Sequence, residues 1–160
     1  MANAEDVSSH IENIDDLNSG LSKEFLTIYI NDQVFGIPVL QIQDVLGEQK
    51  VTKIPLAHEE ISGALNLRGR IVTAINVRKR LSLPALSTNQ KQMSVVVELD
   101  NELFSLVIDK VGDVLSLKNK DFEQNPATLD QTWKNISSGI FRLDGTLLVI
   151  LDIPKLLSKI

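Results

Sequence analysis

The chain contains 160 residues with a formal net charge of −5, and it has no cysteine. A length of this order suits one domain or two small lobes, and the lack of cysteine excludes disulfides, thiolate metal sites and cysteine nucleophiles. The longest unbroken apolar run, at 147–151, is far shorter than the roughly 18 residues of a membrane-spanning helix, and no basic start precedes an apolar segment at the N-terminus. We therefore expect a cytoplasmic protein with no direct membrane insertion.

Residues 1–22 form an acidic segment with five carboxylates and no lysine or arginine in its first 20 positions. The segment lacks the apolar surface to fold alone, so we predict a disordered N-terminal tail. Its apolar residues nevertheless recur at spacings of 4, 3, 3 and 4, which would line one side of a helix if an apolar groove were supplied; they are Val7, Ile11, Ile14, Leu17 and Leu21. The tail could also dock through its charges on a basic face of the body, or stay solvated.

From residue 25 onward, short β-rich segments alternate with turn residues, the pattern of an all-β domain. We predict strands at 25–30, 33–37, 51–54, 63–68, 70–77, 94–100, 103–109, 111–117, 139–143 and 146–151. Asp144-Gly145 between two apolar strands predicts a hairpin with a type I′ turn, and residues 153–160 predict a short closing helix with Pro154 in its first turn. So many short strands favour barrels or a sandwich, because closure hides the sheet edges.

The stretch LPALSTNQKQ at 83–92 is the most loop-like interior segment. We interpret it as the crossing between two lobes. No strict internal repeat is visible, although both halves contain hairpins, so a duplication stays an open hypothesis.

The residues needed for catalysis or metal binding are sparse. The only histidines are His10 and His58, too few for a three-ligand zinc site, and phosphate loops, nucleophile elbows and dinucleotide fingerprints are all missing. Asp109 and Asp113 are the nearest approach to an acid–base pair, but aspartates in such strand–turn regions usually bond turn backbone. We expect no enzyme, no cofactor and no metal, and we expect the single Trp133 to pack between lobes.

The window 61–97 carries cations but no acidic residue, which predicts a positive face; the cations are Arg68, Arg70, Arg78, Lys79, Arg80 and Lys91. A basic-faced barrel that binds nucleic acid is one alternative. Such sites interleave aromatic stacking residues with the cations, whereas this window has none and the sequence pI is about 5.0. We therefore expect no nucleic-acid partner.

The segment RIVTAINV places Ile71, Thr73, Ile75 and Val77 on one face and Arg70, Val72, Ala74, Asn76 and Arg78 on the other. This alternation predicts a half-buried strand whose arginine face is wet. Arg68 differs from the other cations because it precedes Gly69 at a sharp change of direction, where its rigid five-donor fork could reach a carboxylate of a partner.

The stretch IPLAHEEISGALNLRGRIVTAINVR resembles the core motif of CheW-like chemotaxis coupling proteins, centred on Asn66-Leu67-Arg68-Gly69. FLTIYINDQVFGIPVLQIQDVLG upstream, and LVIDKVGDVLSL and LVILDIPKLL downstream, extend the resemblance over about 24–160. Four positions depart from the family pattern: His58 and Thr73 replace prolines, Asn76 an aspartate, and Asp44 a glutamate. Asn76 makes this face more cationic than the family norm.

The resemblance implies a domain at 23–160 built of two SH3-like β-barrels on a shared apolar core, without catalytic activity. It implies an adaptor that couples the cytoplasmic tips of transmembrane chemoreceptors to the regulatory domain of the histidine kinase CheA, recruited to membrane-associated receptor arrays. The receptor-facing groove would include Ile42, Asp44, Arg68, Met93, Val111 and Val114. An adaptor of another chemosensory system, serving surface or pilus motility, is the nearest alternative.

Overall fold

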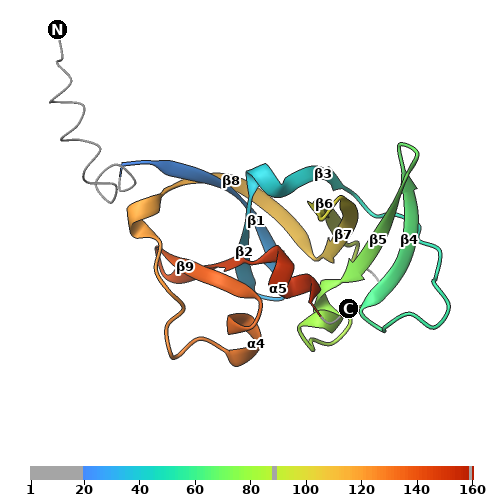
Figure 1. Cartoon of the computed structure of the whole chain (residues 1–160). Coiled ribbons are helices and arrows are strands. Elements are labelled where there is room, and N and C mark those ends of the chain that lie inside the picture. Colours follow the sequence, from blue (N-terminus) through green and yellow to red (C-terminus); the bar gives the residue numbers. More distant parts are fainter. Residues whose placement is uncertain (1–19, 88–89, 159) are drawn as a thin grey trace, which may run out of the picture.

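The computed structural model describes residues 20–87, 90–158 and 160. Over this part of the chain it contains ten strands and a few helices of about one turn, arranged as Figure 1 shows. The elements are β1 (Ser22–Ile30), β2 (Gln33–Pro38), η1 (Val39–Gln41), β3 (Ile42–Leu46), β4 (Ile61–Leu67), β5 (Arg70–Asn76), α3 (Val77–Arg80), β6 (Met93–Leu99), β7 (Glu102–Ile108), β8 (Lys110–Lys118), η2 (Asn119–Asp121), α4 (Gln131–Lys134), β9 (Ser137–Leu143), β10 (Thr146–Leu151) and α5 (Ile153–Leu157).

The strands form two five-stranded sheets, each curled into a barrel. Barrel A has the order β8-β1-β2-β10-β9, and barrel B has the order β3-β6-β7-β5-β4. In each barrel a single bridge joins one outer strand to the segment after the other outer strand. In barrel A, Glu123 after β8 pairs with Ile140 of β9; in barrel B, Thr52 after β3 pairs with Ala64 of β4. Each bridge brings the two edges of its sheet together at one point.

The core confirms the predicted two lobes on a shared apolar centre. The largest buried cluster takes residues from both barrels, among them Ile28 and Phe35 of barrel A and Ile75 and Leu106 of barrel B. Each barrel also has a smaller cluster of its own. Trp133 packs edge-on against Phe35 with ring centroids 5.7 Å apart, so it belongs to the shared core as expected.

The two barrels repeat one chain path. Residues 26–47 correspond without a gap to residues 95–116, and each segment begins with a hairpin. Each also has a bulge at the same place. In the first copy the bulge lies between Ile42 and Asp44 on β3, and in the second it lies on β8, opposite Leu26 and Ile28 of β1. Residues 61–81 correspond likewise to 137–157: Gly63 and Gly139 precede the closing bridges, and Asn76 and Asp152 cap the following helices. A structural duplication is therefore present.

Each repeat contributes to both barrels, which corrects the predicted lobe crossing at 83–92. The hairpin β1–β2 lies in barrel A, while β3, β4 and β5 of the same repeat lie in barrel B; the second repeat does the reverse. The chain therefore crosses between barrels at 39–41 and at 109. Residues 83–92 join α3 to β6 within barrel B, so they separate the repeats and not the lobes.

Several strand limits differ from the prediction. β1 begins at Ser22, inside the predicted tail, whose residues 1–19 lie outside the described residues. The strand predicted at 51–54 is wrong: only Thr52 pairs, where Gly63 allows close approach. The strand at Ile42–Leu46 was missed because Gln43 and Asp44 interrupt its apolar pattern.

The predicted type I′ turn at Asp144-Gly145 is also wrong, because only Gly145 has a positive φ there. The closing helix is confirmed as α5, with Pro154 in its first turn and the Asp152 side chain accepting a hydrogen bond from the Lys155 N–H. Among the described residues, no helix has the length and apolar content to cross a bilayer.

Candidate functional site

Arg68 lies at the tip of the β4–β5 hairpin. Arg68 and Gly69 have φ values of 52° and 83°, the double positive φ of a type I′ turn. The Asn66 side chain stabilises this turn, because its Oδ1 accepts a hydrogen bond from the Gly69 N–H at 2.9 Å. The local sequence thus holds Arg68 on a rigid turn, with 78% of its side chain exposed.

The Arg68 guanidinium already contacts a carboxylate of its own chain. Its Nη2 lies 2.9 Å from Oδ2 of Asp44 on β3, the opposite outer strand of barrel B. The Asp44 oxygen makes no hydrogen bond of good geometry, so the contact is electrostatic. The Arg68 side of this pair is exposed, whereas the Asp44 side chain is only 22% exposed and its Oδ2 is shielded from water, so a partner's carboxylate reaches the pair from the Arg68 side.

The other predicted receptor residues fall into two groups. Ile42 and Val111 occupy equivalent positions in the two repeats, and both are half-buried against the shared core, where the barrels meet. Val114 on β8 is 50% exposed. Met93 lies at the start of β6, beyond the Leu46 end of the β3–β6 pairing, and lines a separate groove with Arg78 and Asp109.

The prediction that the arginine face of β5 is exposed to solvent is wrong. Val72 and Ala74 are fully buried inside barrel B, whereas Ile71 is 77% exposed. The alternation was right, but it could not show that the face shared with Arg70 points into barrel B. Further along, Ile75 enters the shared core from the other face, so the strand is buried on both sides at that end.

Two cations of the predicted positive face, Arg68 and Arg78, pair with carboxylates of the chain, and two others donate to backbone carbonyls. Arg70 donates to the Asn101 carbonyl at 3.3 Å, and Arg80 donates to the Leu156 carbonyl at 2.8 Å. Together with Arg68, these arginines anchor one segment of the protein to another. The window 61–97 is therefore no continuous strip of free cations.

Arg78 is buried, with 6% of its surface exposed, and its guanidinium donates three hydrogen bonds within the described residues. Its Nε and Nη2 donate to the two carboxylate oxygens of Asp109 at 2.7 and 2.6 Å, and its Nη1 donates to the Pro84 carbonyl at 2.7 Å. The hydrogen bond to Asp109 raises the pKa of Arg78 above its ordinary value, although burial opposes this. Charge counting missed this role because it treats every cation alike.

Asp109 stands where the chain crosses from barrel B to barrel A. Besides Arg78, it accepts a hydrogen bond from the Asn31 N–H of barrel A at 2.7 Å. Its carboxylate therefore ties together α3, the β1–β2 turn and the crossing, which is a structural task. Asp113 is exposed, and its carbonyl accepts a hydrogen bond from the Thr27 hydroxyl. No group of three His, Asp or Glu side chains able to hold a metal occurs among the described residues.

Comparison with known proteins agrees with this architecture. Residues 24–160 match the family model described as CheW-like domain. The chain is 30% identical to the chemotaxis protein CheW of Klebsiella aerogenes over 139 residues, covering 87% of this chain and 84% of the relative. It is 28% identical to the chemotaxis protein CheW of Thermotoga maritima, covering 86% and 89%.

A solved structure has the same fold. The crystal structure of the scaffolding protein TtCheW from Thermoanaerobacter tengcongensis superposes with a TM-score of 0.77 at 24% sequence identity. The match covers 86% of this chain and 94% of that one. The paired barrels are therefore shared with an experimentally solved protein.

Proposed function

The chain belongs to the CheW-like domain family, whose members are adaptors of chemotaxis signalling, and on this premise we propose which partners it couples. One partner is the cytoplasmic tip of transmembrane chemoreceptors, and the other is the regulatory domain of the histidine kinase CheA. The protein acts in the cytoplasm, recruited to receptor arrays at the membrane, and catalyses no reaction. The family match over 24–160 supports this proposal.

The arrangement around Arg68 carries the receptor part of the proposal. A receptor tip is a helical hairpin, and a helix in a groove gains most of its binding energy from a few buried apolar anchors, with rim charges fixing its orientation. Ile42, Val111 and Val114 supply half-buried or exposed apolar surface near the barrel junction. Arg68 supplies an exposed cation on a rigid turn, and its contact with Asp44 holds it in place while 78% of its side chain stays open to a partner's carboxylate.

Calorimetric titration tests the proposal directly. We expect the full-length protein to bind the CheA regulatory domain and a receptor-tip fragment of its own organism with micromolar affinity, about −8 kcal/mol. Arg68→Ala should weaken receptor binding about tenfold, the loss of one charged rim contact, and leave kinase binding unchanged. Arg142→Ala is the matched control, because Arg142 makes a similar surface ion pair with Glu123 in barrel A, 2.9 Å long.

Two outcomes would contradict the proposal. If Arg68→Ala binds the receptor fragment as tightly as the parent protein, the assigned groove is wrong. If the protein binds neither partner, the coupling role itself is wrong, and receptors and kinases of another chemosensory system become the next partners to titrate.

A further inference from the structure

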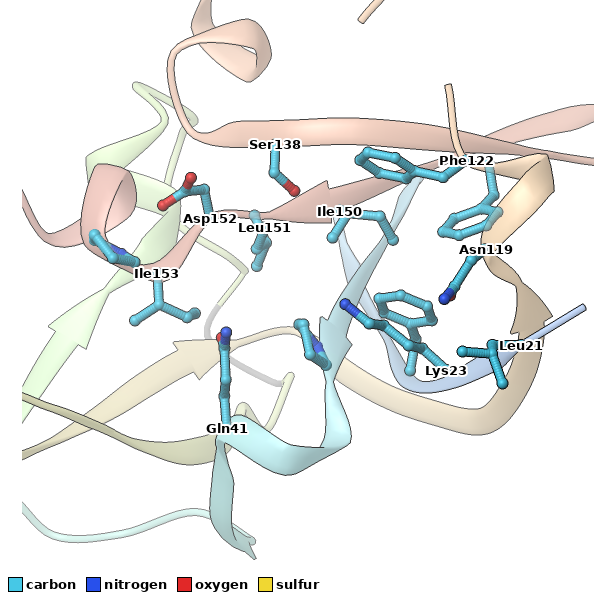
Figure 2. Close-up of a pocket in the computed structure, with 14 residues that line it drawn as sticks. Leu21, Lys23, Gln41, Asn119, Phe122, Ser138, Ile150, Leu151, Asp152 and Ile153 are labelled. Carbon is cyan, nitrogen blue, oxygen red and sulfur yellow. The ribbon is translucent and has the colours of Figure 1, made fainter. Parts of the chain in front are cut away.

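Barrel A contains an open groove of about 820 Å³, lined by apolar and polar residues alike, at the point where the described chain begins. Three phenylalanines form its floor: ring centroids lie 5.3 Å apart for Phe25 and Phe141, and 5.4 Å apart for Phe122 and Phe141. Figure 2 shows Leu21, Lys23, Asn119 and Phe122 at one end of the groove and Asp152 and Ile153 at the other. Leu21 and Phe122 keep 55% and 42% of their surfaces exposed, so the groove presents apolar surface to water.

The equivalent groove of barrel B differs in size and character. It has a volume of only about 180 Å³. Its lining includes Val51, Leu65 and Ser94. In the repeat, these three residues occupy the positions of the three phenylalanines of barrel A. Because the backbone path is the same, the wide aromatic groove comes from the side chains of barrel A. Exposed apolar surface of this kind usually marks a binding site.

We propose that residues 7–17 of the same chain occupy this groove as an amphipathic helix. Leu21, the last residue of the apolar stripe, already lines the groove, so the preceding residues leave from its edge. Residues 18–20 can span up to about 10 Å, and a helix of eleven residues is about 16 Å long. Val7, Ile11, Ile14 and Leu17 would cover the phenylalanines with one face.

Lysines at the Leu21 end of the groove can pair with acids of the tail. Lys23 lines the groove, Lys118 lies opposite Ser22 at the β1–β8 edge, and Lys120 lies in η2 beside Asn119; all three are exposed. Asp152 also lines the groove, and Glu24, Asp121 and Glu123 adjoin lining residues in the chain; Glu123 pairs with Arg142. The tail offers Glu12, Asp15 and Asp16 on its polar side to the lysines. In the alternative surface at 61–97, Arg78 is buried in its pair with Asp109 and Arg68 already contacts Asp44.

The lack of cysteine provides a clean test. Ser138→Cys places a single thiol in the groove, where Ser138 is exposed, and the rate of maleimide modification reports how often the groove is open. We expect modification to be about tenfold slower in the full chain than in a chain without residues 1–18, as for a local opening equilibrium of that size. Ile14→Asp, in the centre of the apolar stripe, should abolish the protection. Ser9→Asp, on the opposite side of the same helix, should preserve it.

The proposal fails if Ile14→Asp and the parent chain are modified at equal rates. It also fails if protection disappears on dilution of the protein, which would show that the tail of a second copy fills the groove. Protection lost in high salt but insensitive to Ile14→Asp would instead indicate docking through charge alone. Should Ser138→Cys not fold, Asn119→Cys offers a second thiol in the same groove. The test requires no receptor or kinase, so its result is independent of the coupling proposal.

Discussion

The hairpin tips of the two barrels have the same backbone position and opposite charge. In barrel B the tip is Arg68-Gly69, and Asp44 on β3 faces it. In barrel A the tip is Asp144-Gly145, and the residue equivalent to Asp44 is Asp113 on β8. Barrel B therefore carries an ion pair within the chain at its tip, whereas barrel A carries two acids at the equivalent positions. The duplicated fold gives the two tips equivalent positions, and the tip residues determine the charge that each presents.

The two crossings between the barrels also have equivalent positions and different side chains. One is tied by the Arg78–Asp109 pair, whereas the equivalent positions of the other crossing are Pro154 and Leu40, and Leu40 is 97% exposed. The first crossing is thus locked by a buried charge pair. The second is apolar and open to solvent, beside the aromatic groove.

The largest effect is expected from breaking the locked crossing. Arg78→Met should lower the free energy of unfolding by about 3–5 kcal/mol, because it leaves the Asp109 carboxylate without its partner in a buried place. Urea denaturation measures this cost. The double variant Arg78→Met/Asp109→Leu should recover part of it, since no unpaired charge remains. Pro154→Ala, at the equivalent site, should change stability far less; equal losses at the two sites would contradict the difference between the crossings.

The next effect concerns the glycines that allow each barrel to close. A Cβ on Gly63 would overlap the Thr52 carbonyl oxygen and lie 2.8 Å from its carbon, and a Cβ on Gly139 would lie 2.6 Å from the Glu123 carbonyl oxygen. Gly63→Ala and Gly139→Ala should each cost about 1–3 kcal/mol, the usual range for an overpacked site. Gly47→Ala is the control in the same denaturation experiment, because nothing lies within 4 Å of its added Cβ. If Gly63→Ala and Gly139→Ala are both as stable as the parent protein, the closing bridges do not contribute to stability.

The smallest effect on stability, and the sharpest on binding, comes from exchanging the tip charges. Arg68→Asp gives barrel B the acidic tip of barrel A, and Asp144→Arg does the reverse. Asp144 is exposed, so Asp144→Arg should change stability by no more than about 0.5 kcal/mol. Arg68→Asp loses the pair with Asp44 and sets two carboxylates against each other, so it should cost about 1 kcal/mol. Receptor-tip binding, measured by calorimetry, should fall for Arg68→Asp and stay unchanged for Asp144→Arg. Equal losses for the two variants would remove the functional distinction between the tips.

Much of the fold could be predicted from sequence because local patterns are strong in it. Alternating apolar residues located most strands, and Pro154 located the closing helix. The internal repeat was also present in the sequence, since 26–47 and 95–116 align without a gap. It is hard to recognise there because the two copies share apolar character and turn positions more than identical residues. With that alignment, 83–92 would have been interpreted as the boundary between repeats.

The site was less predictable, because its properties depend on contacts between distant segments. The glycine after Arg68 correctly indicated a sharp turn, yet nothing near Arg68 in the sequence shows that Asp44 lies 2.9 Å from its guanidinium. Arg78 and Arg80 differ by two positions, but one pairs with a buried carboxylate and the other with helix carbonyls.

Local chemistry thus dictated the strands, the tight turn at Arg68-Gly69 and the family motif, because each depends on residues close together in the chain. The exchange of hairpins between repeats, the inward face of β5, the burial of Arg78 and the aromatic groove of barrel A were decided by packing in three dimensions. Side chains buried by remote strands take their surroundings from those strands, and a period of two cannot say which face the other barrel covers.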